Sequence, residues 1–77
     1  MITTIDLSDL RFNNCPDWYK NIVRKVPNIG HDFEFSENFV EASGFDIVFI
    51  FKSGIECFQR IIKGDESEIM MMILKWS

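Results

Sequence analysis

The stretch Phe45-Asp-Ile-Val-Phe-Ile-Phe51 carries the clearest strand signal in the chain. Apart from the aspartate it consists of β-branched and aromatic residues, which are enriched in strands. A nearly continuous apolar strand is typical of a position that is covered on both faces or backed by a helix. We therefore expect a core built on a sheet, with this segment as a central strand.

The segment before this strand shows an alternating pattern. In Asp32-Phe-Glu-Phe-Ser36, apolar and polar residues alternate, and Phe39 to Ala42 resumes the apolar character after a polar interruption. Alternation places successive side chains on opposite faces of a strand. The pattern predicts a strand over residues 32–42, with Ser43-Gly44 as a tight hairpin turn.

The segment after it fits two interpretations. A turn at Ser53-Gly54 would lead into a strand over residues 55–62. A helix over about 54–63 has more support, because Ser53 and Glu56 fit a capping box and apolar residues recur at helical spacing. We favour the helix.

Three flanking segments complete the pattern. Residues 2–7 alternate and predict a short strand, and residues 16–26 begin with a proline and carry an apolar stripe typical of a helix. Residues 68–76 are predicted as the last strand. The order strand, helix, strand, strand, helix, strand indicates one α+β domain over residues 1–77, with two helices on one face of an antiparallel sheet in a ferredoxin-like or related topology.

The last predicted strand, Glu68-Ile-Met-Met-Met-Ile-Leu-Lys-Trp-Ser77, is unusually apolar for the edge position that this topology gives it. Exposed edges normally carry charges or proline, which prevent pairing with other chains. One alternating face should pack under the helices. Because methionine suits adaptable surfaces, the other face is a candidate contact for a partner. The candidate residues on this strand are Met70, Met72 and Trp76.

The charges are unevenly distributed. The formal net charge is −4, which argues against binding nucleic acid through its phosphates and favours a basic protein partner. No Lys or Arg lies between Lys25 and Lys52. Five carboxylates fall in that interval, and we expect them to form an acidic, partner-binding patch: Asp32, Glu34, Glu37, Glu41 and Asp46.

Catalytic and metal-binding signals are weak. The single histidine, His31, is expected at the surface, and Cys15 is expected to serve in packing or capping. Two cysteines and one histidine do not fit a zinc spacing, and the four glycines are isolated, so no phosphate-binding loop is predicted. We predict no catalytic residue, metal or cofactor, and no enzyme activity.

The N-terminal residues lack a secretion signal, and the longest apolar run, Ile69 to Leu74, is far short of a membrane span. We expect a cytoplasmic protein with free thiols. The leading hypothesis is a small acidic protein that binds another protein, as an inhibitor or immunity-type factor of the kind phages use against host defences. The alternative is a self-associating structural or regulatory module, a homodimer that holds a small ligand at its interface.

Overall fold

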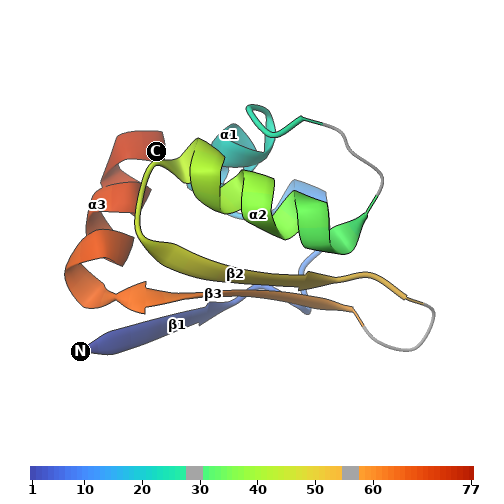
Figure 1. The fold of residues 1–77 in the computed structure, drawn as a ribbon, viewed down its shortest axis with the longest axis horizontal. Coiled ribbons are helices and arrows are strands. Elements are labelled where there is room, and N and C mark those ends of the chain that lie inside the picture. Colours follow the sequence, from blue (N-terminus) through green and yellow to red (C-terminus); the bar gives the residue numbers. More distant parts are fainter. Residues whose placement is uncertain (28–30, 55–57) are drawn as a thin grey trace.

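The computed structural model describes residues 1–27, 31–54 and 58–77. Its strands form one antiparallel sheet in the order β1-β3-β2. Helices α1 and α2 lie on one side of this sheet, and α3 stands at the end where β3 leads into it (Figure 1). In chain order the elements are β1 (Ile2–Asp6), the 3-10 helix η1 (Phe12–Asn14), α1 (Asp17–Val23), α2 (Asp32–Ser43), β2 (Ile47–Lys52), β3 (Gln59–Asp65) and α3 (Glu66–Trp76).

The α+β class is confirmed. The strand predicted over residues 2–7 corresponds to β1, the helix over 16–26 to α1 and the strand over 45–51 to β2. The predicted order is wrong in three other segments, and the ferredoxin-like arrangement is not confirmed. The central position is also different: β3 pairs with both other strands, whereas β2 lies at an edge of the sheet.

Residues 32–42, predicted as a strand, form helix α2. Phe35 and Phe39 are one turn apart and face the core, and Ser43 continues the same face one turn later. Acidic residues in the first turn favour the positive end of the helix dipole. Gly44 ends the helix with φ of +79°, the left-handed conformation that glycine adopts without strain. The alternation of polar and apolar residues over 32–36 therefore does not correspond to a strand.

Residues 54–63, predicted as a helix, contain most of β3 instead. The strand interpretation was nearer, since Arg60 and Ile62 point inward while Gln59 and Lys63 are more exposed. Ser53 does not cap a helix as predicted. Its N–H and hydroxyl instead donate to the Asp32 carboxylate at 2.8 and 3.0 Å. The other member of the predicted capping box lies outside the described residues.

Residues 68–76, predicted as a strand, belong to helix α3. Asp65 caps this helix by accepting a hydrogen bond from the Ser67 N–H at 3.1 Å. Hydrogen bonds from the Met1 amine and from Ser67 lower the pKa of the Asp65 carboxyl. A run of apolar residues fits either a buried strand or a buried helix, and here the cap and the inward face at Ile69 and Met72 accompany a helix.

The core lies between the helices and the inward face of the sheet. Aromatic rings dominate it: Phe39 lies 4.2 Å from Phe49 and 5.4 Å from Tyr19, measured between ring centroids. Tyr19 and Phe39 are almost completely buried, as are Ile62 and Met72. These contacts hold α1 and α2 against β2 and β3.

No helix in the described ranges is both long enough and apolar enough to cross a membrane.

Candidate functional site

Among the residues that the structure describes, the outer edge of β2 has no strand partner for its backbone groups. The Leu7 N–H donates to the Arg60 carbonyl at 2.8 Å, so Arg60 directs its backbone groups to the β1 side. Along an antiparallel strand, successive residues direct their backbone N–H and C=O groups to opposite neighbours. The odd-numbered residues of β3 therefore direct theirs to β2, where they lie opposite Val48, Ile50 and Lys52. The backbone groups of Phe49 and Phe51 consequently point to the free edge.

No described residue forms a hydrogen bond with the N–H groups of Phe49 and Phe51 on that side. The Ile47 N–H at the start of the strand is already used, since it donates to the Phe45 carbonyl at 3.0 Å. An unpaired edge of this kind is a template for a strand from another chain. It is therefore the first component of the candidate site.

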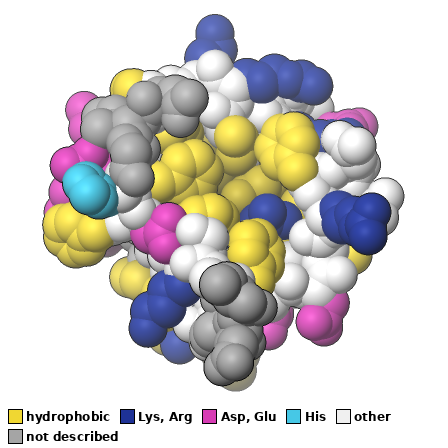
Figure 2. Space-filling model, turned by 90° about the vertical axis from the view of Figure 1, so that its right-hand side faces the viewer, with side chains coloured by type: hydrophobic (Ala, Val, Ile, Leu, Met, Phe, Trp, Pro, Cys, Tyr) yellow, Lys and Arg dark blue, Asp and Glu magenta, His cyan; other side chains and the backbone are white. Residues whose placement is uncertain are grey.

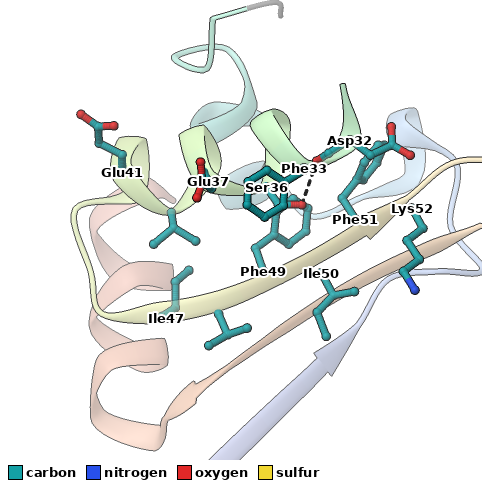
Figure 3. Close-up of a pocket in the computed structure, with 12 residues that line it drawn as sticks. Asp32, Phe33, Ser36, Glu37, Glu41, Ile47, Phe49, Ile50, Phe51 and Lys52 are labelled. Carbon is teal, nitrogen blue, oxygen red and sulfur yellow. Dashed lines mark hydrogen bonds between the residues drawn. The ribbon is translucent and has the colours of Figure 1, made fainter. Parts of the chain in front are cut away.

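A groove of about 780 Å³ runs between α2 and β2. All six residues of β2 line it, although their side chains alternate between the two faces of the sheet. In Figure 3, Ile47 and Phe49 point towards α2, whereas Ile50 points to the opposite side of the strand. A hollow bordered by both faces must lie along the edge, so the groove and the free backbone groups form one site.

The α2 side of the groove is a single helical stripe. Its residues recur one turn apart, as expected for one face of a helix. Phe33 is 72% exposed there, and Val48, on the face of β2 that points away from α2, is 57% exposed, so apolar surface is accessible along the edge. The stripe consists of Asp32, Phe33, Ser36, Glu37, Val40 and Glu41.

Acidic groups border this apolar surface. Glu37 and Glu41 are exposed and lie one turn apart on α2, and both line the groove, although Figure 3 shows the Glu41 carboxylate directed away from β2. Neither forms an ion pair with another described residue. Asp32, at the far end of the stripe, already accepts the two hydrogen bonds from Ser53. The groove therefore combines an apolar wall with two carboxylates that are open to cations.

The structure brings together three of the five predicted acidic residues. Asp32, Glu37 and Glu41 line the groove, but Glu34 and Asp46 do not. Glu34 is half-buried, with its Oε2 atom enclosed and without a hydrogen-bond partner among the described residues, and Asp46 is exposed just before β2.

The predicted contacts near the C-terminus separate from one another and from the groove. Met70 is 57% exposed on the outer side of α3, whereas Met72 is completely buried in the core. Trp76 is half-buried, and its Nε1–H donates to the Ser43 carbonyl at 3.0 Å, which ties α3 to the end of α2. In the folded chain Met72 and Trp76 therefore hold the helices together.

Sequence reasoning missed the apolar members of the groove, notably Phe33 and Val40. A helical projection of residues 32–43 would have placed both on one stripe beside Glu37. The free edge of β2 could not be found in this way, because it depends on which strand occupies the centre of the sheet.

A second cluster surrounds the buried Arg60. Its Nη1 donates to the Leu10 carbonyl at 3.0 Å and to the Cys15 Sγ at 2.9 Å. The guanidinium carbon lies 5.1 Å from the ring centroid of Tyr19 and 4.8 Å from that of Phe58, within the range of cation–π contacts. These contacts fasten the segment after β1 to the central strand.

Burial raises the pKa of the Tyr19 phenol to about 12, although the nearby positive charge of Arg60 opposes this effect. Figure 2 shows hydrophobic side chains gathered at this end of the molecule around a basic group.

Cys15 is buried with a free thiol, and His31 is exposed immediately before α2. Within the described parts of the chain, no group of three or more His, Cys, Asp or Glu residues could hold a metal ion.

Comparisons with protein-family models, with curated proteins and with solved structures found no match to this chain.

Proposed function

We propose that this protein acts by binding another protein, whose extended segment adds to the free edge of β2. The observation that carries the proposal is the combination of an unpaired strand edge with an adjoining apolar groove. Main-chain hydrogen bonds to Phe49 and Phe51 would supply affinity, and the groove would select side chains at alternate positions.

The acidic border suits a basic partner. Opposite charge accelerates encounter between proteins and disfavours partners of the wrong charge. By occupying an edge or a basic surface of its target, such a small acidic protein would act as a cytoplasmic inhibitor or immunity-type factor. The proposal keeps the acidic face of the leading hypothesis from the sequence and replaces the C-terminal strand of that hypothesis with the edge of β2.

Affinity capture with two matched variants tests the proposal. Ser36→Trp places a large ring in the groove, whereas Asn38→Trp makes the same change on α2 outside it. We expect the Ser36 variant to lose at least about tenfold in captured partner, because its ring occupies space needed by one or more side chains of the added strand.

The Asn38 variant should capture the partner as the unmodified protein does. Circular dichroism and thermal unfolding of both variants verify that the fold is retained. If the folded Ser36 variant captures the same proteins in the same amounts, binding does not use this groove and the proposal is wrong.

A further inference from the structure

We infer that the segment bound at β2 carries Lys or Arg at every second position, on the side that faces α2. This inference rests on the proposed strand addition and specifies the chemistry of the partner. It is carried by the positions of Glu37 and Glu41 relative to the edge of β2.

The two carboxylates match the repeat of a strand. Glu37 and Glu41 are four residues apart on α2, which corresponds to about 6 Å along a helix axis. Side chains on one face of a strand recur every two residues, or about 6.6 to 6.8 Å. The difference of less than about 1 Å is easily taken up by flexible Lys or Arg side chains. Consecutive basic residues would instead point to opposite faces.

The apolar part of the stripe suits the same side chains. Phe33 and Val40 are neighbours of Glu37 on the helix surface, at separations of four and three residues. A basic side chain that rises from the added strand could lay its methylene groups against Phe33 or Val40 and place its charge beside a carboxylate. A short acidic or small polar side chain would lack both contacts.

A second copy of this chain fits the edge poorly. If β2 paired with β2 of another copy about a two-fold axis normal to the sheet, both α2 helices would lie on the same face of the joined sheet. The two acidic stripes would then lie on the same face, on either side of the joined edges. Like charges so placed are repulsive, so the acidic border favours a different, basic chain.

Three synthetic hexapeptides with blocked ends separate the pattern from net charge and from strand addition. They are Lys-Val-Lys-Val-Lys-Val, the isomer Lys-Lys-Val-Val-Lys-Val, in which no two lysines are two positions apart, and the neutral Gln-Val-Gln-Val-Gln-Val. Calorimetry gives their affinities, and amide chemical shifts identify the surface they occupy. We expect the alternating basic peptide to bind about tenfold more tightly than the other two, because only it can form both ion pairs in a partly desolvated groove.

Charge reversal supplies the matched control. Glu37→Lys with Glu41→Lys should weaken binding of the alternating basic peptide by about tenfold or more, since attraction becomes repulsion. Asp46→Lys with Glu66→Lys changes the net charge equally but lies outside the groove, so the affinity should change by less than about threefold.

Equal binding of the two basic isomers, or an equal loss in both double variants, would show that net charge alone is recognised and would overturn the inference. Equal binding of the neutral peptide with shifts at Phe49 and Phe51 would also overturn it, but would leave strand addition intact. If no peptide shifts these amides, or if sedimentation shows a dimer and its dissociation on dilution shifts the same amides, both proposals are wrong.

Discussion

Replacing Phe39 by alanine is expected to lower the free energy of unfolding by about 3 to 5 kcal/mol. Phe39 is completely buried, and its ring contacts Tyr19 and Phe49 at centroid distances of 5.4 and 4.2 Å. The change removes apolar burial, leaves a cavity and breaks these aromatic contacts. Because a domain of this size has a total stability of only about 4 to 12 kcal/mol, the variant should be close to unfolding.

Urea unfolding followed by circular dichroism measures this effect. Phe33→Ala is the matched control: it makes the same chemical change on the same helix, but Phe33 is 72% exposed, so the expected loss is within about 0.5 kcal/mol. Phe39→Leu should give a smaller loss than Phe39→Ala and keeps the comparison possible if the alanine variant does not fold. Similar losses for Phe39→Ala and Phe33→Ala would contradict the assignment of α2 as a helix with Phe39 inward.

Replacing Arg60 by alanine is expected to lower the free energy of unfolding by about 2 to 4 kcal/mol. The Arg60 side chain is only 6% exposed and donates to both Leu10 and Cys15. Its loss leaves the Leu10 carbonyl without this donor and removes packing between Tyr19 and Phe58. Arg60→Met fills more of the same space and should cost less.

Removal of the Arg60 charge should also change the pKa of Tyr19. Since the guanidinium charge lowers the pKa of Tyr19 against the effect of burial, its removal in Arg60→Met should raise that pKa further. Tyr19 is the single tyrosine, so ultraviolet absorbance follows its ionisation directly. The raised pKa favours the folded state below pH 10 and this contribution is lost as the pH rises towards 12. An unchanged or lowered pKa in folded Arg60→Met would contradict the described contact.

The sequence predicted those elements whose signals were local and unambiguous. The Pro16 start and apolar stripe predicted α1, and the β-branched and aromatic residues of 45–51 predicted β2. The wrong elements were short segments whose apolar spacing is compatible with either period. Phe33 and Phe35 suggested alternation, although Phe35 and Phe39 form the inward face of α2, and the apolar run before Trp76 fitted both a strand and a helix.

The candidate site was only partly visible from sequence. The segment without Lys or Arg directed attention to Glu37 and Glu41, and both line the groove. The free edge of β2 depends on the pairing of β3 with both neighbours, a long-range property that neither composition nor spacing records. The distinction between exposed Met70 and buried Met72 likewise required the helical form of α3.

Amide hydrogen exchange at Phe49 and Phe51 is the most direct test of strand addition at β2. In the free protein these two N–H groups should exchange faster than those of Val48 and Ile50, whose backbone groups face β3. Saturation with Lys-Val-Lys-Val-Lys-Val should slow exchange at Phe49 and Phe51 by at least about tenfold, because both then donate to the added strand. Unchanged exchange at both amides in the saturated complex would contradict strand addition.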